Sequence, residues 1–447
     1  MSASTATDTR IEHLLARRVG DSRGRPTVEV EVHLACGAMG RAIAPAGASR
    51  GTHEAVDLRD GGDLLGGWGV RRALSELEHE IAPALLGRDA LSQLYIDQRL
   101  IELDGTENKA RRGGNATIAA SMAVAHAAAA ACGLPLWRHL AAGRRTRIPL
   151  PQVQIFGGGA HAGRRVDVQD FLAMPIGAAS FDEAMVMCAE VYRHAGLLMA
   201  EAGRLRGVAD EGGFWPEFAS NEEALAMLAR AIERAGYGPH QVSIALDVAA
   251  GEFGRDGRYR LGLDAIELDS EAWVERLVGW TARFPIVSVE DPVAEDDAAG
   301  MIRFTRAVGE RVQVVGDDFL VTDAARVRAA AASGACNAAL LKPNQAGTLS
   351  EMQAALEAAR AAGMGMVVSA RSGETEDVTI AHLAVGWDAG QLKVGSFARS
   401  ERMAKWNEVL RIEETLGDGA RFAGCEALGC ASGRRAQIAA AHRSDKG

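Results

Sequence analysis

The chain has 447 residues, a formal net charge of −10 and a composition that is 48% hydrophobic and 24% charged. This is the ordinary balance of a globular protein, and it excludes a wholly disordered chain, a collagen and a coiled coil. The negative charge disfavours nucleic acid and anionic membranes as partners, and a phosphorylated substrate would require local cations to offset it.

The first 143 residues are predicted to form a small α+β domain. A turn followed by an alternating strand is expected within 18–35, and a small-residue loop over 44–55. From residue 69 to about 140 the pattern is helical, and its alanine-rich stretch 118–132 predicts a helix that packs closely on its neighbours. A basic, proline-containing connector beginning at Arg144 ends this domain.

Residues 144–424 are predicted to form a second domain, a βα barrel. Short apolar runs alternate there with stretches rich in Ala, Glu and Arg, which indicates βα units around a parallel sheet. The runs lie at 242–247, 285–291, 312–318, 337–342, 365–371 and 391–395. A barrel takes roughly 250 residues, which fits this length. Residues 425–447 are predicted to be a disordered tail.

Six charged residues stand at the ends of these runs or within a residue or two of them. They are Asp247, Glu290, Asp317, Lys342, Arg371 and Lys393. After the first, they are spaced about one βα unit apart, so a barrel would gather them at the carboxyl ends of its strands, where barrel active sites form. Any one of them could be a solvated strand end, but six in register indicate a site.

The order of these residues, three acids and then three bases, predicts metal-assisted proton transfer. Converging carboxylates repel one another unless a cation lies between them, and hard oxygen ligands favour Mg²⁺. A lysine beside such a cation has its ammonium form disfavoured and can act as a base. Arg371 and Ser372 offer a guanidinium and a hydroxyl to an anion. The expected substrate is a small phosphorylated carboxylate that loses a proton beside its carboxylate group.

Glycine-flanked motifs add further candidates. GVADEGG places Glu211 in a loop where partial burial would raise its pKa and make it a general acid. GGGAHAG places His161 between glycines, as in a closing lid, although a lone histidine is more often structural. Gln169 and Asp170 follow in DVQDF, and Ser49 of GASRG is a weak candidate for an outer metal ligand.

Motifs across residues 10–424 resemble those of enolase, in the same order. They include DSRGRPTVEVEV, GASRGTHEA, ADEGG, VEDPVAEDD, GDDFLVTD, LLKPNQAGTLSE and RSGETED. The resemblance implies an N-terminal α+β domain and a modified (β/α)8 barrel. It also implies one tightly held Mg²⁺, a second Mg²⁺ that arrives with substrate, and interconversion of 2-phosphoglycerate and phosphoenolpyruvate.

The resemblance assigns metal and catalytic roles by position. The ligands of the tight Mg²⁺ would be Asp247, Glu290 and Asp317. Ser49 would bind the second ion, and Lys342 would take the α-proton. Glu211, partnered by Asp170, would assist departure of the β-hydroxyl, and His161 would be the lid histidine.

Other matched positions concern substrate and subunit contacts. The substrate-contacting positions are Gln169, Arg371, Ser372 and Lys393. Glu29 and Arg411 match an ion pair that joins subunits in the family, which implies a homodimer or an oligomer of dimers. The N-terminal segment has no apolar core like that of a signal peptide, and no apolar run is long enough to span a bilayer, so a cytoplasmic location without a membrane partner is expected.

Several residues depart from the enolase pattern on the leaving-group and lid side. Ala370 stands where a histidine is expected, Asp170 stands where a glutamate is expected, and Phe214 and Trp215 replace small residues. Two functions therefore stay open. One is a working hydratase. The other is a paralogue in phosphonate natural-product biosynthesis, resembling carboxyphosphonoenolpyruvate synthases. A non-catalytic protein would be expected to lose the base or the metal ligands, and the sequence retains both.

Overall fold

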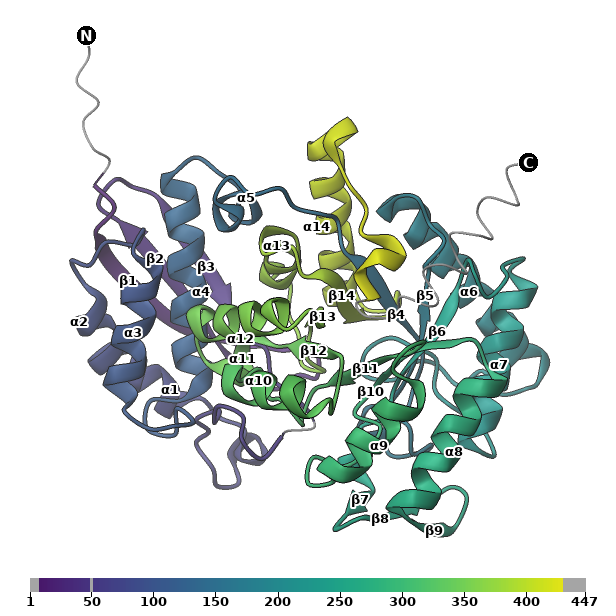
Figure 1. Ribbon diagram of the computed structural model, residues 1–447. Coiled ribbons are helices and arrows are strands. Elements are labelled where there is room, and N and C mark those ends of the chain that lie inside the picture. The colour runs from purple at the N-terminus through teal and green to yellow at the C-terminus, as the bar shows by residue number, and fades with distance from the viewer. Residues whose placement is uncertain (1–7, 49–50, 429–447) are drawn as a thin grey trace.

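The computed structural model describes residues 8–48 and 51–428, which form an N-terminal domain beside a barrel domain (Figure 1). The N-terminal domain has a three-stranded antiparallel sheet in the order β1-β2-β3. Its strands are β1 (Ile11–Gly20), β2 (Pro26–Leu34) and β3 (Met39–Ile43). Its helices are α1 (Arg71–Glu76), α2 (Ala82–Leu85), α3 (Gln93–Asp104), α4 (Gly114–Ala131) and α5 (Leu136–Ala141). The predicted α+β organisation is confirmed.

Helix α4 packs directly on the sheet because its residues are small. A Cβ added to Gly40 of β3 would lie 2.1 Å from the Ala127 nitrogen and 2.3 Å from the Ala123 carbonyl oxygen. Glycine on the strand and alanine on the helix therefore allow backbone to meet backbone. The predicted alanine-rich helix is confirmed, and most of its residues are buried.

Strand β1 is missing from the sequence prediction, which expects a single strand within 18–35. In the structure β1 and β2 flank the turn at 21–25 and pair from His13 with His33 to Gly20 with Pro26. Most side chains of β1 are exposed or half-buried, so its sequence lacks a clear alternation. Its extended conformation is supported by pairing with β2, which local sequence does not report.

Eight strands close the barrel. They are β4 (Leu150–Gly157), β5 (Asp170–Met174), β6 (Ser243–Asp247), β10 (Ile286–Glu290), β11 (Gln313–Gly316), β12 (Ala338–Leu341), β13 (Gly365–Ser369) and β14 (Gly390–Gly395). Neighbouring strands are parallel, except that β5 runs antiparallel to both β4 and β6. A short connection containing the 3₁₀ turn η3 (Gly159–Ala162) therefore suffices between β4 and β5. This confirms the predicted modified (β/α)8 barrel.

Helices cover the outside of the barrel (Figure 1). They are α6 (Phe181–Glu201), α7 (Asn221–Arg234), α8 (Ser270–Arg283), α9 (Ala298–Val308), α10 (Ala324–Ser333), α11 (Pro343–Ala346), α12 (Leu349–Ala361), α13 (Thr379–Gly386) and α14 (Ser400–Leu416). Six of these helices begin at a side-chain cap that accepts a hydrogen bond from a backbone N–H three residues on. The caps are Ser180, Ser220, Asp269, Asp297, Asp323 and Thr348. Each cap fixes the point at which the preceding loop ends.

Between β6 and α8 the chain adds a small antiparallel sheet. Its strands are β7 (Gly254–Arg255), β8 (Arg258–Leu261) and β9 (Ile266–Asp269). This sheet follows the carboxyl end of β6, which is Asp247. It is therefore part of the connections at the rim of the barrel where Asp247 lies.

The two domains are joined next to the end of β12. Helix α4 contacts α11, which begins directly after Lys342, and α3 contacts α12. Asp97 of α3 accepts hydrogen bonds from Ser121 Oγ at 2.6 Å and from the Ser350 nitrogen at 2.8 Å. Burial raises the pKa of this carboxyl. The N-terminal domain is thus attached where the barrel presents its predicted base.

The predicted disordered tail begins too early. Residues 424–428 form the 3₁₀ helix η6 (Gly424–Leu428), in which Ala427 and Leu428 are buried. The Ala427 carbonyl accepts a hydrogen bond from Gln391 Nε2 at 2.9 Å, so the barrel interior holds this segment in place. The rest of the predicted tail lies outside the described residues. No described helix has the length and apolar character to cross a membrane.

Candidate active site

The six charged residues predicted at strand ends meet at one rim of the barrel. They are Asp247, Glu290, Asp317, Lys342, Arg371 and Lys393, and all are buried. Asp247 and Glu290 are the last residues of β6 and β10, and the others follow β11, β12 and β13 or lie near the end of β14. Because these strands are parallel, their carboxyl ends share the rim.

Two lysines hold the three predicted metal ligands. Lys393 Nζ donates to Asp247 Oδ2 at 2.6 Å and to Glu290 Oε2 at 2.7 Å. Lys342 Nζ donates in the same way to Asp317 Oδ2. Burial and the charge of Asp247 raise the pKa of Glu290 well above its ordinary value, although Lys393 opposes the shift. The repulsion among the carboxylates is therefore only partly offset by the ammonium groups.

The carboxylates suit a hard divalent cation. Glu290 Oε1 is buried, and no group in the described part of the chain donates a hydrogen bond to it. Carboxylate oxygens are the ligands that Mg²⁺ prefers, and an unsatisfied buried oxygen is open to such an ion. Asp291 and Asp318 lie beside Asp317, and these three residues are close enough to share a cation. The predicted ligands Asp247, Glu290 and Asp317 do not form such a close group among the described residues. Ser49, the predicted ligand of a second ion, lies outside the described residues.

The pKa of Lys342 is shifted upward, in contrast to the expectation that its ammonium form is disfavoured. Burial is the largest single effect and lowers this pKa, but the combined attraction of Asp317, Glu290 and Asp318 outweighs burial and the repulsion of Arg371. The expectation assumed a metal cation beside the lysine, whereas the charge in contact with it here is a carboxylate. A cation that competed for Asp317 would weaken the interaction that stabilises the ammonium form.

Arg371 extends to the N-terminal domain. Its Nη1 and Nη2 donate to the Glu54 carboxylate at 2.9 and 3.3 Å, and Nη1 also donates to Asn344 Oδ1 at 3.1 Å. Burial disfavours the charged guanidinium, but Glu54, together with Asp317 and Asp318, more than compensates and raises the pKa of Arg371. Gln345 Nε2 donates to both Glu54 at 3.1 Å and Asp317 at 2.9 Å. Glu54 thus connects the guanidinium to the metal-ligand side.

Glu54, Asn344 and Gln345 were not predicted as site residues. All three stand in motifs that carry the enolase resemblance, GTHEA and KPNQ, so a signal was available. Their roles depend on contacts between segments that are far apart in the chain.

Two predicted substrate contacts are also placed at the rim. Gln169 Nε2 donates to Asp247 Oδ2 at 2.9 Å, and Gln169 Oε1 is buried without a hydrogen-bond partner among the described residues. Ser372 Oγ accepts a hydrogen bond from Arg23 Nη1 of the N-terminal domain at 3.2 Å. Both residues line a small cavity at this rim.

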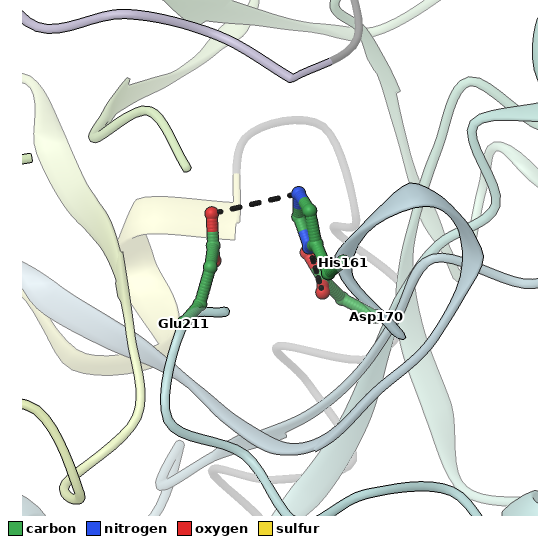
Figure 2. Close-up of side chains that lie close together, drawn as sticks. All are labelled: His161, Asp170 and Glu211. Atoms are coloured by element: carbon green, nitrogen blue, oxygen red, sulfur yellow. Dashed lines mark hydrogen bonds and ion pairs between the residues drawn. The ribbon is translucent and has the colours of Figure 1, made fainter. Parts of the chain in front are cut away.

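Glu211, His161 and Asp170 form a buried cluster (Figure 2). His161 Nδ1 lies 3.2 Å from Asp170 Oδ1, and its Nε2 lies 3.7 Å from Glu211 Oε1. Burial alone would lower the pKa of His161, but Glu211 and Asp170 raise it to about 9. Burial raises the pKa of Glu211 despite the charge of His161. An imidazolium therefore lies between two acids, and the pKa of Glu211 is shifted in the direction that a general acid requires.

Gln154 of β4 was not predicted, and it holds this cluster in place. Its Nε2 donates to Asp170 Oδ1, and its Oε1 accepts from the Gly213 nitrogen at 2.9 Å. A Cβ on Gly213 would lie 2.6 Å from Gln154 Oε1, so the loop needs glycine to approach the strand. The shorter Asp170 side chain is thus positioned from two sides, by His161 and by Gln154.

The inner cavity has a volume of about 20 Å³ and lies between the acid cluster and the lysines. Its lining includes Glu211, Lys342 and Lys393, together with Ala370 where the family pattern has histidine. The Ala370 nitrogen donates to the Lys393 carbonyl at 2.9 Å, so the backbone at this position is fixed beside the lysine. A methyl group therefore faces the cavity at the position of an expected imidazole.

Phe214 supports the Glu211 loop from behind. Its ring stacks on Tyr192 with centroids 4.3 Å apart and planes 15° apart. The Tyr192 hydroxyl donates to the Gly212 carbonyl at 3.0 Å. Phe214 also contacts Phe156 of the barrel core, so it packs beneath the loop.

Two family models match the chain. The model described as "Enolase, N-terminal domain" matches residues 11–140, and the model described as "Enolase, C-terminal TIM barrel domain" matches residues 145–430. These matches, together with the acids and lysines at the carboxyl rim of the barrel, support an enzyme of the enolase superfamily. The chain belongs to the enolase family.

Proposed function

We propose that the protein is a Mg²⁺-dependent lyase that interconverts 2-phosphoglycerate and phosphoenolpyruvate. The observation that carries the proposal is the position of Lys342 relative to the acid cluster. In the barrel order, β12 and β5 stand four strands apart in a ring of eight, so Lys342 and Asp170 come from opposite sides. A base and an acid on opposite sides of one cavity suit removal of a proton and departure of a hydroxyl from adjacent carbons.

The residues divide these tasks between them. Lys342 takes the proton beside the substrate carboxylate, and the positive groups of Lys393 and Arg371 bind the anionic substrate. Glu211, whose pKa is raised by burial, gives a proton to the departing hydroxyl. Asp247, Glu290 and Asp317 would hold a divalent cation, which would supply a fixed positive charge for the substrate carboxylate.

Phosphoenolpyruvate formation from 2-phosphoglycerate in Mg²⁺, followed by absorbance, tests this proposal. Lys342→Ala should reduce kcat by about 10²–10⁴-fold, the usual contribution of a general base. Lys342→Arg keeps the positive charge but not the base, so it should be nearly as inactive. The proposal fails if the wild-type enzyme forms no more phosphoenolpyruvate than Lys342→Ala.

Ala370 favours a second candidate function. No imidazole is present beside Lys393 to assist the dehydration, because Ala370 presents only a methyl group to the cavity there. Carboxyphosphonoenolpyruvate synthases, which the departures resemble, transfer a phosphonoformyl group from a nucleotide to an enolpyruvate unit. Incubation with 2-phosphoglycerate or phosphoenolpyruvate and the cytidylylated phosphonate, followed by phosphorus NMR, tests this candidate. Absence of a new phosphonate product rejects it.

The proposal includes a homodimer. Arg411 is exposed and pairs with Glu408 at 2.8 Å, and Glu29 lies 3.6 Å from Arg41 within the chain. The exposed Arg411 can exchange its partner for one across a subunit contact at little cost, whereas Glu29 is buried and also pairs with Arg17. Light scattering should give twice the chain mass for the wild type and a lower mass for Arg411→Glu.

A further inference from the structure

Gln154 of β4 contacts the acid cluster from behind, without facing the inner cavity. Its side chain is fully buried. The described residues that line the inner cavity include Asp170 and Glu211 but not Gln154. Any influence of Gln154 on the reaction must therefore act through the residues that it contacts.

The chemistry of its neighbours fixes the orientation of the Gln154 amide. A backbone N–H can only donate, so the Gly213 nitrogen, 2.9 Å away, must face Oε1. Burial would raise the pKa of Asp170, but the adjacent His161 lowers it, so this carboxylate is ionised and can only accept from Nε2. Turning the amide over would break both hydrogen bonds. One side chain thus ties Asp170 to the loop that carries Glu211.

The Gln154 side chain has no room to withdraw from the carboxylate that it contacts. A Cβ on Gly213 would lie 2.6 Å from Oε1 and 3.0 Å from Cδ, and a Cβ on Gly157 would lie 3.4 Å from both amide atoms. Glycine backbone therefore packs against the amide from two sides. The loop is itself bound to β4, since the Phe214 nitrogen donates to the Ile155 carbonyl at 2.8 Å.

Gln154 and Asp170 are complementary in length. The family pattern has glutamate where this chain has Asp170, and the extra methylene adds one carbon–carbon bond, about 1.5 Å. Gln154 already contacts the shorter carboxylate, so a glutamate at position 170 would be driven into the amide. An asparagine at position 154 would withdraw the amide by a similar length and leave Asp170 without this donor. Only a paired exchange of the two residues, to asparagine and glutamate, would span the same gap.

The position of Asp170 affects the acid that serves the departing hydroxyl. Burial raises the pKa of Glu211, His161 lowers it, and the charge of Asp170 raises it again. His161 lies between the two acids, with its Nδ1 3.2 Å from Asp170 Oδ1 (Figure 2). Asp170 Oδ2 is buried without a hydrogen-bond partner among the described residues and lies 3.6 Å from Lys393 Nζ. Without Gln154, the carboxylate could turn towards this lysine and away from His161.

We propose that Gln154 is a positioning residue for the acid cluster, matched in length to Asp170, and that the two residues can be exchanged only together. The inference deepens the proposed function and rests on it, because Glu211 protonates the departing hydroxyl there. It explains the shorter acid at position 170 as one half of a matched pair that keeps the acid cluster in place.

Kinetics with 2-phosphoglycerate test the proposal in Gln154→Asn, in Asp170→Glu and in the variant that combines them. Each single change should lower kcat by about 10²-fold, the effect of a misplacement of about 1 Å. The KM of Gln154→Asn should change by less than about threefold, because Gln154 does not line the cavity. The combined variant should recover kcat to within about tenfold of the wild type.

Gln152 provides a matched control on the same strand. It is also buried, and its Nε2 donates to Gln391 Oε1 at 3.1 Å in the barrel interior rather than to the acid cluster. Gln152→Asn shortens a buried glutamine of β4 in the same way. It should leave kcat unchanged, whatever it does to stability.

Urea melts of the same variants separate this inference from the proposed function. The folding equilibrium constant should fall about tenfold in each single variant and largely recover in the combined one. If the wild type forms no phosphoenolpyruvate, the proposed function fails, and the recovery of stability still decides whether the two residues are matched.

The inference is overturned if the two losses of stability simply add. With an active wild type, it is also overturned if Gln154→Asn keeps the wild-type kcat, if the combined variant does not recover kcat, or if Gln152→Asn loses as much kcat as Gln154→Asn.

Discussion

Glu54→Gln should destabilise the protein by about 3 kcal/mol, because it leaves a buried guanidinium without its carboxylate. The side chains of Arg371 and Glu54 are only 3% and 5% exposed, and their closest atoms are 2.9 Å apart. At an effective dielectric constant of about 20, this separation corresponds to a gross attraction of about 6 kcal/mol. Desolvation of both groups opposes that attraction, and Asn344 still accepts a hydrogen bond from Arg371, so the net loss is smaller.

A double-mutant cycle with Arg371→Met isolates the pair. Urea denaturation is followed by tryptophan fluorescence and by near-ultraviolet circular dichroism, whose coincidence checks that unfolding is two-state. The double variant buries no unpaired charge at this position. Its loss of unfolding free energy should therefore be smaller than the sum of the losses in the two single variants, and the difference gives a coupling energy of about 2–3 kcal/mol.

The exposed pair of Arg234 with Glu201, 2.6 Å apart, provides the control. Glu201→Gln should change stability by less than about 1 kcal/mol, because exposed pairs are solvated and flexible. The reasoning is refuted if Glu54→Gln costs no more than Glu201→Gln, or if the losses from Glu54→Gln and Arg371→Met simply add.

Three further predictions concern the metal, the pH dependence and the Glu211 loop. Mg²⁺ at about 100 times its Kd should raise the free energy of unfolding, measured in a calorimetric melt, by about 2.7 kcal/mol. Glu290→Gln should remove most of that gain. An unchanged gain in this variant would exclude Asp247, Glu290 and Asp317 as the Mg²⁺ site. Burial lowers the pKa of His382 to about 4. The contribution of the neutral imidazole to stability is therefore present above pH ~6.5, the pKa in the unfolded chain, and is lost as the pH falls from there towards the folded-state pKa. Between pH 7.5 and about 5, the free energy of unfolding from urea melts should fall by about 2 kcal/mol less in His382→Gln than in the wild type. Equal falls in the two proteins would contradict the assignment. Phe214→Ala should lower the free energy of unfolding by about 2–3 kcal/mol, whereas Tyr192→Phe, which keeps the stacked ring, should lower it by about 1 kcal/mol. Equal losses of stability would show that the stacking does not support the loop.

Predictions that depend on short stretches of sequence agree well with the fold. The apolar runs at 242–247 and 337–342 became β6 and β12, and the alanine-rich run became α4. In each case the sequence signal is local, because the hydrophobic periodicity of a strand or helix is found within a window of consecutive residues. Strand β1 and the segment 424–428 were missed because pairing with β2 and contact with the barrel interior hold them in place.

The candidate site likewise combines features that local sequence predicts with contacts that only the tertiary structure shows. The sequence by itself determined that acids and lysines end successive barrel strands, since each stands beside its own apolar run, and parallel strands bring their ends to one rim. Only the tertiary structure decided that Glu54 pairs with Arg371, 317 residues away, that Gln154 holds Asp170, and that arginines from the His161 loop and from strands β7 and β8 line one cavity. Those contacts form when the barrel closes and the N-terminal domain packs on it, and no periodicity along the chain encodes them.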